Sequence, residues 1–176
     1  MFDHFYSKGG NVFDTAYIYN NGKSDYYLGK WIEARGLRNE IVVLGKGAHT
    51  PDCFPEKIRP QLEETLARMS TSYVDIYCLH RDNESVPVED FIDTLNELKD
   101  EGLLTVFGAS NWSLERFKAA NDYALSNNKQ PFTVLSNNFS LARMNNPVWP
   151  GCFSCSEDDY VNYLTENQIA IFPWSS

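Results

Sequence analysis

Six positions along the chain carry side chains of the kinds that enzymes use, and each follows a short apolar run. In a parallel β/α arrangement the carboxyl ends of all strands open onto one face, where side chains from successive strands meet. A carboxylate, an amine, an imidazole, a hydroxyl, amides and an indole gathered there could bind a polar ligand and move protons. In chain order these side chains are Asp14, Lys46, His80, Ser110 with Asn111, Asn137 with Asn138, and Trp174.

The apolar runs have the length and composition of buried strands, and they lie at 12–13, 41–44, 74–79, 103–107, 132–135 and 169–172. Between them, apolar residues recur with helical spacing, which predicts amphipathic helices lying on a sheet. Strands that alternate with helices indicate parallel strands joined by right-handed crossovers. The expected buried helix faces contain Tyr27, Leu28, Trp31 and Ile32; Ile58, Leu62, Leu66 and Met69; Val88, Phe91, Ile92, Leu95 and Leu98; Phe117, Ala120, Ala124 and Leu125; and Val161 and Leu164.

Boundary residues support these helices. Pro55 and Pro87 stand where two of the helices should begin, because proline suits a first helical turn. Gly102 stands where a helix should stop. Ser156 and Asp159 resemble a capping box with Asp in the usual Glu place. The stretch 142–156 shows no periodicity, and long loops of this kind often act as lids or cofactor clamps.

The order of elements predicts the α/β class and a (β/α)8 TIM barrel with about six of its eight strands present. A complete barrel of this type usually needs roughly 250 residues, and the chain has 176. A closed barrel also pairs both edges of its sheet. We therefore expect residues 1–176 to form a single barrel domain that is truncated at both ends.

Composition narrows the classes of partner. The formal net charge is −9 and no cluster of Lys and Arg exceeds a dipeptide, which argues against nucleic-acid binding. No apolar run approaches the ~18 residues of a membrane span, and the first ten residues lack the apolar core of a signal peptide. We expect a cytoplasmic protein that acts on small molecules, with neither nucleic-acid nor membrane partners.

The four cysteines do not predict a metal site. Cys78 lies within an apolar strand and is expected to be a buried small residue. Cys152 and Cys155 form a Cys-x-x-Cys in a loop, but a structural zinc site needs four ligands and no second pair follows. Plain loop residues are the favoured interpretation, with a redox-sensitive pair and metal ligands as the alternatives.

Several motifs together resemble the aldo-keto reductase superfamily. They are GNVFDTAYIY at 10–19, SDYYLG at 24–29, LGKG at 44–47, DIYCLH at 75–80, FGASNW at 107–112 and FPWSS at 172–176. They follow the order of the family and cover nearly the whole chain. The segments KGAHTP at 46–51 and HRD at 80–82 are similar to bacterial members, some of which are fused to a second oxidoreductase domain. The chain resembles the central part of such a domain.

The resemblance implies an NAD(P)H-dependent oxidoreductase that reduces aldehydes or ketones, sugars included, with Asp14, Tyr19, Lys46 and His80 as catalytic residues. The chemistry agrees with these roles. Hydride attack on a carbonyl creates an alkoxide, so a proton donor is needed. Tyrosine, with an ordinary pKa of ~10, is a weak acid unless a cation such as Lys46 stabilises its phenolate. Asp14 would hold Lys46, and His80 would orient the carbonyl or relay the proton.

The resemblance also assigns the cofactor contacts. Ser110, Asn111 and Asn138 would bind the nicotinamide carboxamide, which needs both donors and acceptors. The family usually has Gln where this chain has Asn138, which is one methylene shorter. Trp174 would stack on the nicotinamide ring. The chain has no Gly-x-Gly-x-x-Gly, but this family binds its dinucleotide on the barrel. NADP(H) is the expected cofactor, with NAD(H) as the alternative.

The substrate walls are expected from His49, Arg81 and Trp112, which lie just past strand ends. Arg81 could equally form an ion pair with Asp82. The expected partners are a small carbonyl or alcohol substrate and a fused or associated oxidoreductase domain. The sequence is also compatible with two other functions, a catalytically inactive fragment and a cofactor-binding regulatory module on the same fold.

Overall fold

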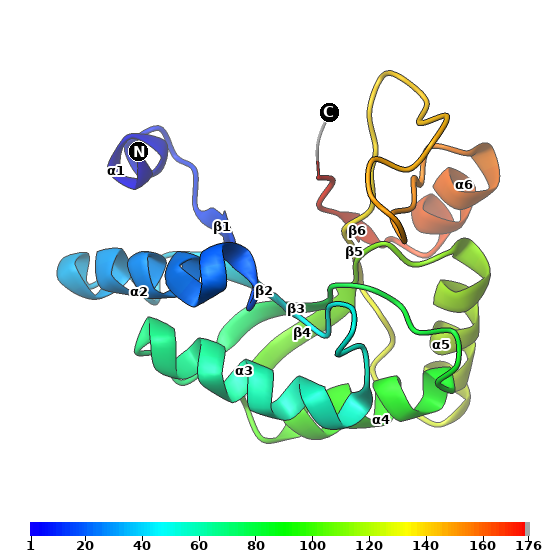
Figure 1. The fold of residues 1–176 in the computed structure, drawn as a ribbon, viewed down its shortest axis with the longest axis horizontal. Helices are drawn as coiled ribbons and strands as arrows, with labels where there is room; N and C mark the ends of the chain where they lie inside the picture. The colour runs from blue at the N-terminus through cyan, green and yellow to red at the C-terminus, as the bar shows by residue number, and fades with distance from the viewer. Residues whose placement is uncertain (175–176) are drawn as a thin grey trace.

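A single curled parallel sheet organises the chain (Figure 1). The computed structural model describes residues 1–174. The strands pair in chain order, from β1 at one edge to β6 at the other, and every pair is parallel. The predicted fold class is confirmed, because six parallel strands with alternating helices form an incomplete (β/α)8 barrel. The strands are Val12–Asp14 (β1), Val42–Gly47 (β2), Val74–Leu79 (β3), Leu104–Ala109 (β4), Val134–Leu135 (β5) and Ala170–Ile171 (β6).

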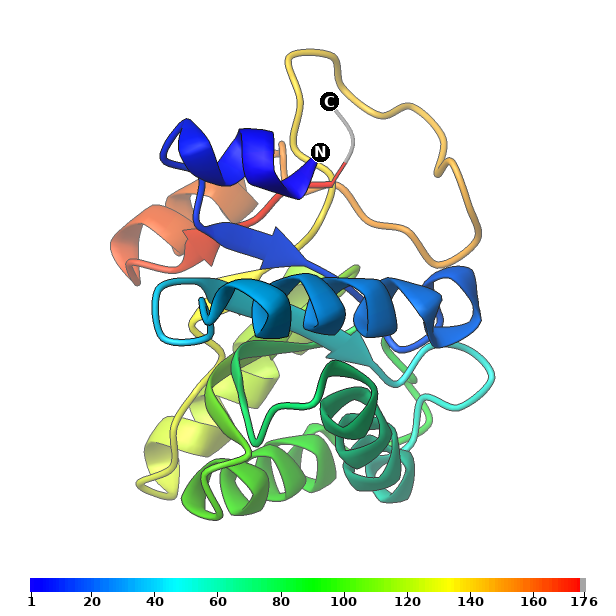
Figure 2. The same cartoon turned by 90° about the vertical axis from the view of Figure 1, so that its left-hand side faces the viewer.

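Helices cover the convex side of this sheet, while the N-terminus and the described chain after β6 lie on the open side, away from α3 and α4 (Figures 1 and 2). As predicted, α3 begins at Pro55 and α4 begins directly after Pro87. The predicted capping box is wrong. The N-cap of the sixth helix is Glu157 and its side chain makes no cap hydrogen bond. The helices are α1 Phe2–Ser7, η1 Tyr19–Gly22, α2 Lys23–Arg35, α3 Pro55–Met69, α4 Val88–Asp100, α5 Leu114–Ser126 and α6 Asp158–Glu166.

The two faces of the sheet carry different apolar clusters because side chains alternate along a strand. The outer face packs under the helices and holds Phe13, Val43, Tyr77 and Phe107, all buried. The concave face holds a smaller cluster, made of Leu44, Ile76, Cys78 and Val134 with partly buried neighbours. Three residues of the predicted helix faces are not buried. Tyr27 is 61% exposed and Leu125 is 63% exposed, and Val161 is only partly buried.

The concave face leads directly to the predicted site. Lys46 lies two residues beyond Leu44 in β2, and His80 lies two residues beyond Cys78 after β3. The same spacing places Ser110 beyond Gly108 of β4, where an added Cβ would lie 1.9 Å from the carbonyl oxygen of Val134 in β5. Glycine at this position therefore allows the backbones of β4 and β5 to approach. Because alternate residues of a strand share one face, the side chains of Lys46, His80 and Ser110 lie together at one end of the sheet.

Candidate active site

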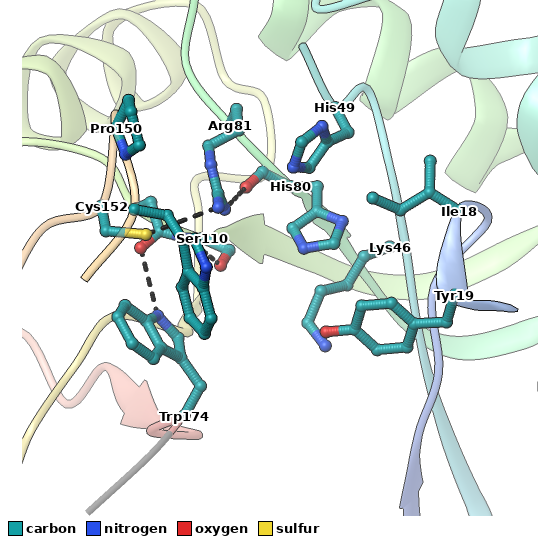
Figure 3. A pocket seen from close by; sticks show the side chains of 12 residues that line it. Ile18, Tyr19, Lys46, His49, His80, Arg81, Ser110, Pro150, Cys152 and Trp174 are labelled. Atoms are coloured by element: carbon teal, nitrogen blue, oxygen red, sulfur yellow. Dashed lines mark hydrogen bonds between the residues drawn. The ribbon is translucent and has the colours of Figure 1, made fainter. Parts of the chain in front are cut away.

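A cavity of about 580 Å³ opens at the carboxyl ends of the strands (Figure 3). Its walls come from the ends of β2, β3 and β4, from the segment after β1, from the chain after β6 and from the long loop between β5 and α6. Eight of the eleven predicted site residues line it. The lining residues are Ile18, Tyr19, Lys46, His49, His80, Arg81, Ser110, Asn111, Trp149, Pro150, Cys152 and Trp174.

Lys46 is the charged centre of the site. Its side chain is only 3% exposed and forms an ion pair with Asp14, which is half-exposed. Parallel pairing sets Asp14 beside Leu44, two residues before Lys46, so the ion pair follows from the strand register. A buried ammonium needs such a partner because burial without one is costly. The Nζ atom of Lys46 lies 5.3 Å from the ring centroid of Tyr19, and the Tyr19 hydroxyl points toward Lys46 (Figure 3).

The backbone after β1 fixes the place of Tyr19. The amide of Tyr17 donates to the carbonyl of Lys46 at 2.8 Å, so this segment follows the edge of β2. Tyr19 comes two residues later, at the start of η1. Asn20 and Asn21 then adopt left-handed conformations, with φ of 50° and 53°, which asparagine tolerates better than most residues. This tight turn lets α2 begin at once and leaves the Tyr19 ring 38% exposed at the cavity.

The buried His80 ring packs against two other rings. Its ring meets Tyr19 edge-on at a centroid distance of 5.5 Å and His49 edge-on at 4.8 Å. Burial, followed by the positive charges of Lys46, His49 and Arg81, lowers the pKa of His80 to about 2. The imidazole is therefore neutral at neutral pH. A neutral ring can orient a carbonyl by hydrogen bonding, whereas it cannot deliver a proton as an imidazolium.

This shift predicts a pH dependence of stability. The unfolded chain protonates His80 near pH 6.5, but the folded chain does not until about pH 2. The unfolded state thus binds more protons throughout that window, so the free energy of unfolding falls as the pH drops below about 6.5. From pH 6.5 to 5 this group should contribute a loss of about 2 kcal/mol.

Urea unfolding at pH 7, 6 and 5 measures this loss. His80→Gln should show a shallower decline than wild type over that range. His4→Gln is the matched control because His4 is exposed on α1, and it should keep the wild-type slope. Equal slopes for wild type and His80→Gln would contradict the assignment.

The opposite wall of the cavity carries an amide, a hydroxyl and an indole. Asn111 has a left-handed backbone, with φ of 59°, and its Nδ2 donates to Ser110 Oγ at 2.9 Å. Ser110 Oγ in turn donates to the carbonyl of Ser136 at 2.7 Å. The Nε1 of Trp174 donates to Asn111 Oδ1 at 3.1 Å, and the Trp174 ring lies 6.0 Å from that of Trp149.

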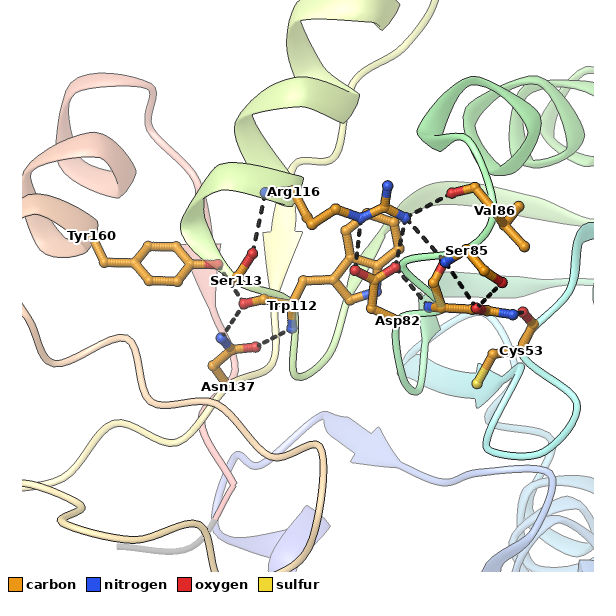
Figure 4. Close-up of polar contacts among 10 residues, drawn as sticks. Cys53, Asp82, Ser85, Val86, Trp112, Ser113, Arg116, Asn137 and Tyr160 are labelled. Atoms are coloured by element: carbon orange, nitrogen blue, oxygen red, sulfur yellow. Dashed lines mark hydrogen bonds and ion pairs between the residues drawn. The ribbon is translucent and has the colours of Figure 1, made fainter.

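Asn137 holds this wall from behind (Figure 4). Its Oδ1 accepts from the amides of Asn111 at 2.6 Å and Trp112 at 3.3 Å, and its Nδ2 donates to the Trp112 carbonyl at 2.9 Å. Trp112 itself is fully buried, with its ring 5.2 Å from that of Phe132. The expectation that Trp112 faces a ligand does not agree with this placement. Its backbone supports the site, and its side chain belongs to the core.

Asn138 also lies outside the cavity lining. It is 7% exposed and its backbone fastens the long loop, donating to the Phe153 carbonyl at 3.0 Å and accepting from the Cys155 amide at 2.9 Å. Cys155 and Cys152 are both free and buried. Cys152 lies in the cavity wall, where its sulfur accepts from Arg81 Nη2 at 3.4 Å. Within residues 1–174, no group of three or more His, Cys, Asp or Glu residues could hold a metal ion.

The model of the aldo/keto reductase family matches residues 1–176. The chain belongs to the aldo/keto reductase family. It is 27% identical to an aryl-alcohol dehydrogenase [NADP(+)] of Phanerodontia chrysosporium over 99% of this chain and 47% of that protein. It is 30% identical to a norsolorinic acid reductase of Aspergillus flavus over 99% of this chain and 46% of that protein.

Solved aldo/keto reductase structures share the fold. A Klebsiella pneumoniae aldo/keto reductase in complex with NADP and acetate superposes with a TM-score of 0.74 at 22% identity, covering 93% of this chain and 52% of that one. A Gluconobacter oxydans glycerol dehydrogenase gives a TM-score of 0.77 at 20% identity, covering 96% and 50%. This aldo/keto reductase chain thus spans about half the length of the relatives that it matches. None of its helices within 1–174 is long and apolar enough to cross a membrane.

Sequence reasoning missed four residues of this aldo/keto reductase cavity, namely Ile18, Trp149, Pro150 and Cys152. The last three belong to the aperiodic stretch 142–156, where the absence of periodicity was the only signal. Trp149 is 58% exposed, and its ring lies 6.0 Å from that of Trp174, 25 positions later in sequence. The structure thus brings a loop residue into the wall through a long-range contact that local sequence does not specify.

Proposed function

We propose that this chain carries the active site of an NADPH-dependent reductase of aldehydes and ketones. The observation that supports this most strongly is the convergence of Tyr19, Lys46 and His80 at one end of the cavity. The proposal also draws on relatives, since one is named an NADP(+)-dependent aryl-alcohol dehydrogenase and one solved neighbour holds NADP. An aromatic alcohol or aldehyde is the substrate class that these names favour.

In the proposed reaction Tyr19 donates its hydroxyl proton to the carbonyl oxygen as hydride reaches the carbon. The Lys46 ammonium stabilises the phenolate that remains, and Asp14 keeps that ammonium in place. His80, neutral and edge-on to Tyr19, orients the carbonyl oxygen. Because the donors are held in position before the substrate arrives, charge that develops on the oxygen is stabilised with little reorganisation.

The wall opposite Tyr19 suits a nicotinamide. Asn111 gives one of its two Nδ2 hydrogens to Ser110, so the other remains for a carboxamide. Trp174 offers an aromatic face in the same cavity, and Asn138 lies just behind this wall. In the proposal Ser110 and Asn111 hold the carboxamide, Asn138 contributes from behind this wall through a bridging water, and Trp174 packs on the ring. The bound cofactor supplies the hydride.

The decisive experiment is NADPH consumption by the purified chain with benzaldehyde and with simple ketones, and with NADH in parallel. We expect oxidation of NADPH that depends on the carbonyl compound. Cofactor binding with no turnover on any carbonyl would favour a regulatory module instead. Failure to bind either cofactor would favour an inactive fragment.

Cofactor binding itself gives a second prediction. Stacking of a nicotinamide on Trp174 should quench tryptophan fluorescence, and Trp174→Ala should remove most of that quench. The dissociation constant of NADPH should rise by roughly 3- to 10-fold, as expected for the loss of one aromatic pair. Trp149→Phe is the matched control, because Trp149 lies 6.0 Å from Trp174 in the same cavity. A quench that is unchanged in Trp174→Ala but lost in Trp149→Phe would reassign the stacking residue.

A further inference from the structure

Arg81 carries a positive charge that no carboxylate balances. The guanidinium is half-buried and lines the cavity. It donates from Nη1 to the His80 carbonyl at 2.8 Å and from Nη2 to Cys152 Sγ at 3.4 Å. In the part of the chain that the structure describes it forms no ion pair. The expected alternative, a pair with Asp82, is excluded because Asp82 is bound by Arg116 through two hydrogen bonds of 2.8 and 2.9 Å (Figure 4).

The cavity wall around Arg81 carries no acidic side chain among the described lining residues. The chain has 24 Asp and Glu residues and a net charge of −9, but none of these acids is among the described residues that line the cavity. Lys46 is neutralised by Asp14, and His80 is uncharged. Among the described residues, Arg81 is therefore a cation of the cavity lining without a carboxylate partner. A partly desolvated cation of this kind is stabilised by a bound anion.

The free donors of Arg81 match one kind of anion. A guanidinium has five N–H groups in a planar fork, and two of them are used by His80 and Cys152. The remaining donors can form paired, charge-assisted hydrogen bonds to a carboxylate. Figure 3 shows Arg81 extending into the cavity between His80 and Cys152. The same wall includes the aromatic side chains of Trp149 and Trp174, whose rings lie 6.0 Å apart.

We propose that Arg81 binds a carboxylate on the substrate, so that the preferred substrates are aromatic aldehydes or ketones that also carry a carboxylate. This inference rests on the proposed function and adds the substrate class to it. A phosphate of the cofactor presents similar chemistry to a guanidinium. The experiment therefore has to separate a substrate carboxylate from a cofactor phosphate.

The test uses ligand-observed NMR to measure the binding of benzoate, and of its neutral analogue benzamide, to the purified 176-residue chain without cofactor. We expect benzoate to bind at least tenfold more tightly than benzamide. Arg81→Gln should weaken benzoate by roughly 10- to 100-fold and change benzamide less than twofold. The benzoate affinity of Arg81→Lys should lie between those of wild type and Arg81→Gln, because lysine keeps the positive charge but lacks the planar fork of donors. Similar binding of benzoate and benzamide, or a preference that survives in Arg81→Gln, would overturn the proposal.

Matched controls complete the design. Arg35→Gln removes the same charge from the last turn of α2, outside the cavity, and should leave benzoate binding unchanged. Saturating NADP+ should leave benzoate bound, whereas competition between the two would assign Arg81 to a cofactor phosphate and overturn the proposal. In a kinetic arm, the preference for 4-carboxybenzaldehyde over benzaldehyde in kcat/KM should collapse in Arg81→Gln. If neither aldehyde is reduced, the proposed function fails while the benzoate measurement still decides the role of Arg81.

Discussion

Tyr19→Phe should slow carbonyl reduction by about 10²- to 10⁴-fold, the usual contribution of a positioned general acid. The substitution removes only the hydroxyl, so the ring can keep its edge-on contact with His80 and its place 5.3 Å from the Lys46 Nζ atom. The NADPH dissociation constant should stay near its wild-type value, since the proposed cofactor wall lies across the cavity. The loss should therefore appear in kcat and in kcat/KM together.

The chain supplies a close control for this substitution. Tyr17 lies two residues earlier in the same segment, and its hydroxyl donates to Glu64 at 2.9 Å instead of facing the cavity. Tyr17→Phe should keep turnover within about twofold of wild type, because the lost hydrogen bond is exposed and worth roughly 1 kcal/mol. Steady-state rates of NADPH oxidation measure both variants. Turnover of Tyr19→Phe close to wild type would remove Tyr19 from the role of proton donor.

The site residues that the sequence predicts well are those that lie at the ends of strands. Lys46 and His80 stand at the ends of apolar runs, and each continues the concave row of its own strand. Because parallel strands present their carboxyl ends at one edge, spacing along the sequence becomes proximity in space. The Asp14 to Lys46 ion pair follows from this register alone.

The part that sequence predicts poorly depends on turns and on long-range packing. The family resemblance predicts Ser110 and Asn111 at the cofactor, and the place of Trp112 just past a strand end predicts it in the substrate wall. The left-handed backbone of Asn111 ends the regular alternation there, and Trp112 is fully buried in the core. Asn137, the residue before the predicted Asn138, accepts a hydrogen bond from the backbone amide of Asn111, which lies 26 positions away in sequence. No local pattern specifies such a contact.

The buried position of Trp112 predicts a large loss of stability on truncation. Its ring lies 5.7 Å from that of Phe91 in α4 and 5.2 Å from that of Phe132, and the Arg116 guanidinium lies 5.2 Å from its centroid. Trp112→Ala would leave a cavity among these groups, and such substitutions of a buried aromatic residue typically cost about 3–5 kcal/mol. The free energy of unfolding from urea titration should fall by that amount.

Truncation of a second, exposed tryptophan distinguishes the effect of burial from the effect of losing a tryptophan side chain. Trp149 is 58% exposed on the loop that lines the active-site cavity, so Trp149→Ala should change the free energy of unfolding by less than about 1 kcal/mol. Its effect should appear instead in ligand binding. If Trp112 acts only through the core, Trp112→Phe should recover much of the lost stability and leave the preference for benzoate over benzamide unchanged. A loss below about 1 kcal/mol in Trp112→Ala would contradict the core role of this side chain. A changed ligand preference in Trp112→Phe would mean that the side chain reaches the ligand.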